Sequence, residues 1–384
     1  MSDLFWPGDA RAGDLLTDAS FLRAMVAVEE AWLDVLGIGH GPLPDLDPTT
    51  IPSESGGSPV LGLVSILREQ LDGEAARWVH RGLTSQDVVD SALMVMLRDA
   101  VSAVRRDLRT HVGLLADLVE AHRATPMVAR TLTQHAVPTT FGLKVSVWLT
   151  TVLDADDGLA SLAFPVQLGG AAGTLAAVVE VGLDPAAARD RLAGALGLAP
   201  SLPRHTSRAP VTRIGDAAVG CTDAWGRIAN DVLTLSRPEI DELAEGEGGG
   251  SSTMPHKRNP VLSVLIRRAA LAAPQLAATL HLAAADSADE RAAGAWHAEG
   301  ATVSTLLRRT VVAGSQATEL LEGLRVHADR MAATLGAADV GSEQRSMAQL
   351  AGIQPRADYR GASDEIIDAV LDRARRSLKR EEDT

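Results

Sequence analysis

The chain has 384 residues, a formal net charge of −14 and one cysteine. Such an acidic protein is not expected to bind nucleic acid or acidic membranes, and any anionic partner must meet a local cluster of basic groups. A lone cysteine excludes an internal disulfide framework and favours a reducing compartment. No secretion signal opens the chain, and the uncharged stretch 158–179 is interrupted by Pro165 and a glycine pair. We therefore expect a cytoplasmic protein without a membrane span.

The first 83 residues are expected to form a small N-terminal helical domain. Apolar residues recur on one helical stripe over Ser20–Leu36, and a loop rich in Gly, Pro and Asp follows over 37–57. Ser58 and Pro59 then open a second helix that runs to about Leu71.

The middle of the chain, residues 84–330, has the pattern of a long-helix bundle. The stretch 85–123 contains no proline and keeps apolar residues at helical spacing throughout. Because alternating β-branched patterns are rare, we expect an all-α protein. Several of the predicted helices are apolar on more than one face. This pattern favours burial of the helices between subunits over a single thick core within one chain. Further long helices are predicted over 138–163, 210–243, 260–285 and 291–324.

The last part, residues 331–384, is expected to be a shortened C-terminal domain. Its stretch 337–358 is polar and poorly periodic. One further helix is predicted over 364–378, with Ser363 as its N-cap. This part is too small for an independent core.

The stretch from Gly248 to Pro260 carries the strongest chemical signal in the sequence. Three glycines followed by Ser-Ser-Thr predict a loop, and Asn259-Pro260 predicts a helix start with Asn259 as N-cap. A loop at a helix N-terminus with hydroxyls and Lys257, one of only three lysines, suits an anion or a developing oxyanion. The alternative is a flexible linker, which rarely carries a run such as Met-Pro-His-Lys-Arg-Asn.

Three other polar stretches precede this loop. Arg130–Thr140 is a polar island that could equally be a capping loop before a helix. Gln167–Thr174 is a glycine-rich turn that permits close approach of a ligand or of another backbone. Pro203–Arg208 clusters two arginines with His205, as a site for a polycarboxylate requires, although a solvated basic turn explains it as well. No stretch has the Cys and His spacing of a metal site.

Taken together, these stretches resemble the fumarase/aspartase superfamily. Gly250–Pro260 is similar to its signature loop, His80–Asp87 to its first characteristic region, and Arg130–Thr140 to its second. Within the superfamily, the resemblance is closest to the 3-carboxy-cis,cis-muconate cycloisomerases. The features that carry it are Thr84–Val88, Gly169–Thr174, His205–Arg208, Glu290-Arg291 and Trp296–Glu299.

The resemblance implies a homotetramer that shares one central helix bundle, with each active site assembled from three subunits. It implies addition or elimination next to a carboxylate of a small polycarboxylate substrate, without a metal or organic cofactor. Carried over by position, Ser251 would transfer the proton, supported by Lys257 and Asn259. The residues implied in substrate binding are His80, Thr84, Ser85, Gln134, His205, Arg208, Ser252, Thr253 and Met254.

The chemistry explains why such groups are needed. Removing a proton next to a carboxylate builds an enolate-like dianion, which the N–H groups of residues 252–254 and the charge of Lys257 could stabilise. A serine hydroxyl becomes a usable base only when nearby positive charge and backbone dipoles stabilise its alkoxide. The glycines at 248–250 would let the loop close over the substrate.

One departure from the superfamily pattern bears on the reaction. Branches that use a histidine in the second region, where it assists a poor leaving group, have it at the position of Leu132. A carboxylate leaves as a stable anion and needs no acid, so Leu132 is compatible with lactone chemistry. His135, three residues on, could take the acid's place, and other stable leaving groups satisfy the same logic.

Three functional hypotheses follow. The leading one is a 3-carboxy-cis,cis-muconate cycloisomerase-type enzyme, in which the substrate carboxylate adds to a double bond and Ser251 delivers the proton. The second is a superfamily lyase that releases fumarate from another succinate derivative, either adenylosuccinate-lyase-like or secondary-metabolic. The third is a non-catalytic helical scaffold.

Overall fold

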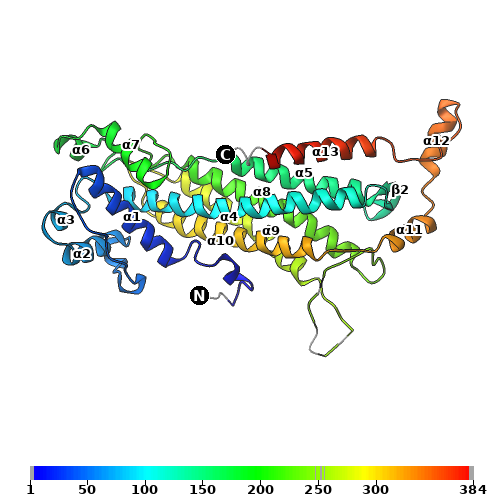
Figure 1. The fold of residues 1–384 in the computed structure, drawn as a ribbon, viewed down its shortest axis with the longest axis horizontal. Coiled ribbons are helices and arrows are strands. Elements are labelled where there is room, and N and C mark those ends of the chain that lie inside the picture. The colour runs from blue at the N-terminus through cyan, green and yellow to red at the C-terminus, as the bar shows by residue number, and fades with distance from the viewer. Residues whose placement is uncertain (1–3, 247, 251–252, 255, 380–384) are drawn as a thin grey trace. The chain divides into compact units, whose positions relative to one another are not determined.

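The structure is a computed structural model that describes residues 4–246, 248–250, 253–254 and 256–379. Its chain divides into two compact units, each built from three stretches. Unit 1 comprises residues 1–103, 161–219 and 273–312, and unit 2 comprises residues 104–160, 220–272 and 313–384. Four long helices, α4 (Ser85–Ala121), α8 (Ala209–Leu235), α9 (Val261–Ala285) and α10 (Ala295–Glu322), contribute to both (Figure 1).

Unit 1 contains the first half of α4 together with shorter elements from residues 9–78 and 176–196. The helix α1 (Asp18–Leu36) begins at a capping box between Thr17 and Ser20 and ends at Gly37, which has a left-handed backbone. It packs against α7 (Pro185–Leu196). The remaining elements are η1 (Asp9–Ala12), η2 (Pro48–Thr50), η3 (Glu54–Gly56), α2 (Val60–Gln70), α3 (Gly73–Trp78) and α6 (Ala176–Glu180).

Unit 2 combines α5 (Phe141–Ala160) and the second halves of α4 and α8 with two small antiparallel sheets. Strand β1 (Pro126–Thr131) pairs with β2 (Gln134–Thr140), and β3 (Leu243–Ala244) pairs with β4 (Arg325–Val326). The helix α11 (Ala328–Ala337) packs on β1, and α13 (Ser363–Lys379) lies along α5, preceded by α12 (Ser342–Ala351) (Figure 1).

The structure confirms that the predicted long helices exist, but some of them begin or end at other residues. The helix predicted over 85–123 is α4, and those predicted over 260–285 and 364–378 are α9 and α13, each within about two residues. The helix predicted over 210–243 ends at Leu235 instead, because a turn and β3 follow. The helix predicted from 291 begins at Ala295. The structure does not test the three-domain division, which stays a prediction.

The polar island Arg130–Thr140 is a β-hairpin, which corrects both the predicted capping loop and the helix start at Pro138. Thr131 pairs with Gln134, so Leu132 and Thr133 form a two-residue turn. Both have positive φ, 47° and 72°, as a type I′ turn requires. Pro138 lies inside β2, and α5 starts only at Phe141.

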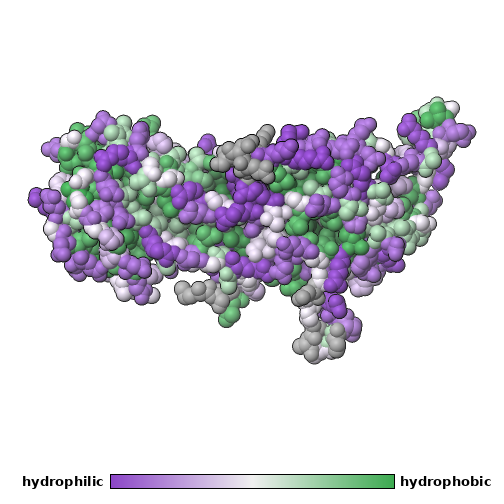
Figure 2. Space-filling view, in the orientation of Figure 1, coloured by the Kyte–Doolittle hydropathy of each residue, from purple (hydrophilic) through white to green (hydrophobic). Residues whose placement is uncertain are grey.

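The helix α13 shows how the C-terminal part is held. Its buried positions Ile367, Leu371 and Ala374 recur at helical spacing and form one apolar stripe. The visible outer face is hydrophilic (Figure 2), and Arg373 pairs with Asp154 (2.7 Å) and Asp157 (2.8 Å) of α5. This part therefore uses the core of unit 2 instead of having one of its own.

Within the described residues, α9 is the one helix long and apolar enough to cross a membrane by length and composition alone. Helices in the cores of soluble proteins pass the same test, so this observation is weak evidence for a span.

A buried histidine ties three helices together in the core of unit 2. The indole N–H of Trp225 donates to Nδ1 of His111 (3.1 Å), and Nε2 of the same ring lies 2.8 Å from the Thr318 hydroxyl. His111 is 0% exposed, and its burial lowers the pKa of the ring to about 4. The neutral ring accepts one hydrogen bond and donates the other, an arrangement that the protonated ring could not maintain.

We expect His111 to make the stability of the fold depend on pH. Because the unfolded chain binds a proton near pH 6.5 and the folded chain near pH 4, the free energy of unfolding rises with pH across this window. Urea titrations of the wild type and of His111→Asn between pH 4.5 and 7.5 measure the effect. The free energy of unfolding of the wild type minus that of His111→Asn should grow by about 2–3 kcal/mol toward high pH. This follows from about 1.36 kcal/mol for each pH unit between the two pKa values. Parallel curves would contradict this assignment.

Candidate active site

The start of α4 presents two hydroxyl side chains that the sequence predicts to bind a carboxylate, Thr84 and Ser85. The Asp87 carboxylate accepts the backbone N–H of Thr84 (3.0 Å), which is the half of a capping box supplied by the third helical residue. Thr84 and Ser85 are both half-buried. Their position at the N-terminus of a 37-residue helix favours an anion, since free N–H groups and the helix dipole point toward it.

Asp87 also fastens the glycine-rich turn to this helix start. Its Oδ1 and Oδ2 accept the N–H groups of Gly169 (2.9 Å) and Gly170 (3.0 Å), and the Gln167 amide donates a further bond (3.2 Å). Burial raises the pKa of Asp87 to about 7, against the lowering effect of these donors. The turn therefore has a packing role here, consistent with one of the two interpretations left open by the sequence.

Both glycines are required where they stand. A Cβ on Gly169 would lie 2.3 Å from Cε1 of His205, and Gly170 has a φ of +66°. The His205 ring is buried with Nε2 3.1 Å from the carbonyl oxygen of Gly170. Burial, followed by the charge of Arg291, lowers the pKa of His205. The ring is thus neutral near pH 7 and locked against the turn.

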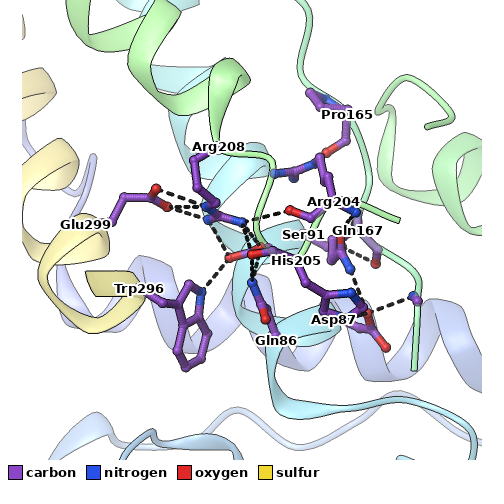
Figure 3. Close-up of polar contacts among 12 residues, drawn as sticks. Gln86, Asp87, Ser91, Pro165, Gln167, Arg204, His205, Arg208, Trp296 and Glu299 are labelled. Atoms are coloured by element: carbon purple, nitrogen blue, oxygen red, sulfur yellow. Dashed lines mark hydrogen bonds and ion pairs between the residues drawn. The ribbon is translucent and has the colours of Figure 1, made fainter. Parts of the chain in front are cut away.

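A buried ionic cluster contacts the first two turns of α4 (Figure 3). The Arg208 guanidinium donates to the Asp90 carboxylate (2.6 and 3.1 Å) and to the Glu299 carboxylate (3.0 and 3.2 Å). Burial alone would lower the pKa of Arg208, but these two carboxylates raise it. The Trp296 indole N–H donates to Asp90 (2.8 Å), and the Gln86 amide donates to Asp90 (3.3 Å) and to the His205 carbonyl (2.8 Å).

This cluster joins α4, α8 and α10 within unit 1. Arg208, Asp90 and Glu299 are 4%, 1% and 1% exposed, so they hold one another in place out of contact with solvent. The contacts seen for Arg208 and His205 are internal to the protein. Their predicted roles in substrate binding stay predictions, and the observed geometry makes both of them residues that position the Thr84–Ser85 turn.

The loop before α4 is held in a strained conformation. His80 has a φ of +65°, and its Nδ1 lies 2.7 Å from the buried Glu29 carboxylate of α1. The Trp32 indole N–H donates to the carbonyl of Arg81 (2.7 Å). Backbone strain of this kind persists where the surroundings impose it, and it is typical of functional sites.

Sequence reasoning did not place Arg291 in the site, although it lies directly beside Thr84. Its guanidinium donates to the Thr84 hydroxyl, and the side chain is exposed. A cation, two hydroxyls and a helix N-terminus together form a cradle for a carboxylate. We call Thr84, Ser85 and Arg291 the carboxylate cradle. The signal that could have found Arg291 was the pair Glu290-Arg291, which is already among the features that carry the resemblance.

The signature loop belongs to unit 2, where its base is closed by backbone pairing. Gly249 N–H donates to the Asn259 carbonyl (2.7 Å), and Asn259 N–H donates to the Gly249 carbonyl (2.8 Å). A Cβ on Gly249 would lie 2.2 Å from Cγ2 of Val261, so only glycine fits. Lys257 is exposed on this loop. Ser251 and Ser252 lie outside the described residues.

The prediction of Asn259 as the helix cap is wrong. The amide of Asn259 donates to the Gly250 carbonyl (3.4 Å), and α9 begins at Val261. The buried Glu245 carboxylate caps this helix, since it accepts the N–H groups of Leu262 (3.1 Å) and Ser263 (2.7 Å). Asn259 is thereby left to stabilise the loop.

The hairpin of the second region carries Gln134 and Leu132. Arg130 on β1 makes a two-pronged ion pair with the buried Glu242 (2.7 and 2.9 Å), which anchors the base of the hairpin. Leu132 is 96% exposed at its tip, and Gln134 is exposed beside it. A leucine with positive φ and almost complete exposure serves no packing purpose within the described chain.

The candidate residues thus fall into two sets. Unit 1 brings together His80, Thr84, Ser85, His205 and Arg208, and unit 2 contains Gln134, Thr253, Met254, Lys257 and Asn259. A site that combines the two sets stays a prediction. Across the described residues, no group of three or more His, Cys, Asp or Glu side chains is placed to hold a metal ion.

A family model described as lyase matches residues 58–274, more than half of the chain. The chain belongs to this lyase family. The fumarase/aspartase superfamily predicted from the sequence is thereby confirmed. The match covers the carboxylate cradle residues Thr84 and Ser85, the hairpin and the signature loop.

Known proteins similar to this lyase differ in their reactions. Nitrosuccinate lyase of Streptomyces davaonensis is 48% identical over 292 residues, which are 72% of this chain and 61% of that protein. A 3-carboxy-cis,cis-muconate cycloisomerase of Bradyrhizobium diazoefficiens is 44% identical over 273 residues, 69% of this chain and 60% of that protein. The chain therefore covers about 60% of the length of these relatives.

Among solved structures, the lyase is similar to the 3-carboxy-cis,cis-muconate lactonizing enzyme from Pseudomonas putida. The TM-score is 0.83 at 29% identity, over 97% of this chain and 88% of that one. This likeness confirms the all-α, long-helix fold predicted from the sequence.

Proposed function

We propose that this lyase catalyses reversible elimination next to a carboxylate, in which the group that leaves is a stable anion. The observation that carries the proposal is Leu132 at the tip of the hairpin. An exposed leucine offers no proton, whereas departure of an amine requires a positioned acid. Nitrite and carboxylate both leave unprotonated at neutral pH, so neither needs one.

The position of His135 supports this interpretation. Successive residues of a strand face opposite sides, so His135 and Gln134 of β2 point away from each other. His135 lines a cavity with Lys144 and Arg227, on the side of the hairpin opposite to Gln134. We therefore propose that His135 does not replace the acid missing at position 132.

The proposed mechanism divides the work between the two sets of residues. The carboxylate cradle and Gln134 bind the substrate carboxylates. Ser251 removes a proton from the carbon next to one of these carboxylates, which becomes the enolate-like dianion. Lys257 and the N–H groups of the loop stabilise the negative charge. As the electron pair forms the double bond, the leaving group departs with its own bonding pair.

Two substrates fit this scheme. Nitrosuccinate would lose a proton and nitrite to give fumarate, a reaction favoured by the similarity to nitrosuccinate lyase. A lactone derived from 3-carboxy-cis,cis-muconate would open, or form in reverse, with its own carboxylate as the leaving group. The similarity to the cycloisomerases favours this second candidate.

We propose that the protein forms a homotetramer in which three subunits contribute to each active site. Such a site needs more than one copy of the chain. The support is an apolar stripe on α9. Val264, Leu271 and Leu282 are 53%, 69% and 72% exposed, and their spacings of seven and eleven residues place them on one helix face. Burial of this stripe against other copies would remove a large apolar surface from water.

A two-substrate assay tests the proposed function. We expect purified protein to release nitrite and fumarate from nitrosuccinate in equal amounts, or to consume the diene absorbance of 3-carboxy-cis,cis-muconate. Nitrosuccinate is the first choice because of the higher identity. Turnover of neither substrate, together with activity on a succinate that releases an amine, would contradict the proposal.

A further inference from the structure

A cavity of about 690 Å³ lies within unit 2, apart from any residue assigned above to catalysis or substrate binding. It is bordered by the hairpin, α5, the C-terminal end of α8 with the turn that follows, and α11, and it is open to solvent on one side. Its volume suits a small organic ligand. The polar side chains that line it are those of Arg130, Thr133, His135, Lys144, Arg227, Asp231, Thr234, Arg237, Glu239, Arg330 and Thr334.

The lining is strongly basic in a protein that is acidic overall. The lining contains two carboxylates, Asp231 and Glu239. It also contains five lysine or arginine side chains, those of Arg130, Lys144, Arg227, Arg237 and Arg330. Arg130 is neutralised by Glu242 behind the wall. A cluster of positive charge that survives in a chain of net charge −14 creates a local field that attracts anions.

The single carboxylate of Asp231 is shared by more than one basic side chain. It accepts the Trp148 indole N–H (2.7 Å) and pairs with both Arg227 (2.5 Å) and Lys144 (3.6 Å). One negative charge is thus shared by two cations. A second anion in the cavity would complete the neutralisation.

Two further arginines lack a carboxylate partner among the described residues. Arg330 donates through Nε to the carbonyl of Ile240 (2.8 Å) and through a terminal nitrogen to that of Glu239 (3.0 Å), which fixes its orientation without cancelling its charge. Arg237 is exposed in the turn after α8. The C-terminal dipole of α8 favours one cation at this place, but it does not account for a ring of them.

We propose that this basic cavity binds a small polyvalent anion, either a polycarboxylate or inorganic phosphate. Arg237, Arg330, Arg227 and Lys144 supply the charge, and the Thr234 hydroxyl supplies a neutral hydrogen bond. Because Thr133 and His135 belong to its wall, the bound anion stiffens the hairpin whose other face carries Gln134. The binding does not depend on the proposed elimination reaction.

Isothermal titration calorimetry with inorganic phosphate and with tricarballylate tests the site on the full chain. Arg237→Glu reverses one charge of an exposed side chain that has no ion-pair partner in the part of the chain that the structure describes, so the fold should be retained. We expect it to weaken binding by about tenfold or more, equivalent to 1.4 kcal/mol. Arg330→Gln provides a second variant from another element. The matched control is Arg213→Glu, an exposed arginine of α8 outside the cavity, which should bind within about twofold of wild type.

A background variant separates this site from the signature loop. In Ser251→Ala/Lys257→Met, the loop has lost the hydroxyl of Ser251 and the charge of Lys257, and anion binding should persist within about twofold of wild type. Binding of phosphate alone, or of tricarballylate alone, would identify the anion. The proposal is overturned if neither anion binds, if Arg237→Glu and Arg330→Gln both bind as wild type, or if the background variant no longer binds.

Discussion

Replacing Ser251 with alanine is expected to lower kcat/KM by about 10³-fold or more, the scale on which one key catalytic group contributes. The substitution removes the hydroxyl that takes the proton but leaves every backbone N–H of the loop in place. Steady-state rates with nitrosuccinate, or with 3-carboxy-cis,cis-muconate if that is the substrate, measure the loss. Circular dichroism and thermal unfolding should be unchanged.

The neighbouring hydroxyl is the matched control. Ser252 is predicted to act through its backbone N–H, which alanine keeps, so Ser252→Ala should cost much less activity than Ser251→Ala. Equal losses in both variants would mean that the proton-transfer group has been misassigned. A protein whose function is unaffected by Ser251→Ala would instead be a non-catalytic scaffold.

Replacing Arg208 with methionine is expected to lower the free energy of unfolding by about 3–5 kcal/mol, the usual cost of removing one partner from a buried ion pair. Asp90 and Glu299 would then be two buried carboxylates without their cation. Urea unfolding near pH 7 measures the change. The matched control is Arg213→Met, an exposed site in α8, the helix that Arg208 directly precedes, and it should stay within about 0.5 kcal/mol of wild type.

A triple variant distinguishes charge from packing. In Arg208→Met/Asp90→Asn/Glu299→Gln, the two buried carboxylates are neutral, and part of the lost stability should return. The return is not complete, because the buried Arg204 is also stabilised by Asp90 and Glu299 and stays charged. If the triple variant is no more stable than Arg208→Met, then lost packing and hydrogen bonds dominate. A loss below about 1 kcal/mol in Arg208→Met, the range of exposed ion pairs, would contradict the role of the cluster.

The long helices could be predicted because each has a sustained apolar period and few internal breaks. The hairpin could not, for identifiable reasons. Its residues are mostly polar and exposed, so no buried face imposes an alternating pattern. Its turn is Leu132-Thr133, without the Asn-Gly or Asp-Gly pair that normally announces a type I′ turn. Pro138, a helix-start signal elsewhere in the chain, instead lies in a strand.

Local signals also failed where a distant residue competed for the same role. Asn259 has the sequence of an N-cap, yet α9 is capped by Glu245, which lies 17 and 18 residues before the two N–H groups that it accepts. The ionic cluster joins Asp90 to residues 118 and 206 positions away, Arg208 and Trp296. No spacing rule connects such residues, because the packing of α4, α8 and α10 sets their proximity.

The site residues show the same division. Thr84, Ser85 and the signature loop were found because the resemblance to a superfamily covers them. Asp87 and Arg291 required the structure, since their roles depend on what they touch: the N–H groups of Gly169 and Gly170 in one case and the Thr84 hydroxyl in the other. The absence of an acid at Leu132 was inferred from the resemblance, and the structure adds that this side chain is exposed at the hairpin tip.

In the proposed reaction, the leaving group departs as a stable anion without an acid. The most direct measurement compares kcat/KM for nitrosuccinate and for aspartate, which share a succinate skeleton and differ in the group expelled. We predict a preference for nitrosuccinate of about 10²-fold or more, the lower end of what a general acid contributes. Release of ammonia from aspartate as fast as nitrite from nitrosuccinate would contradict the account.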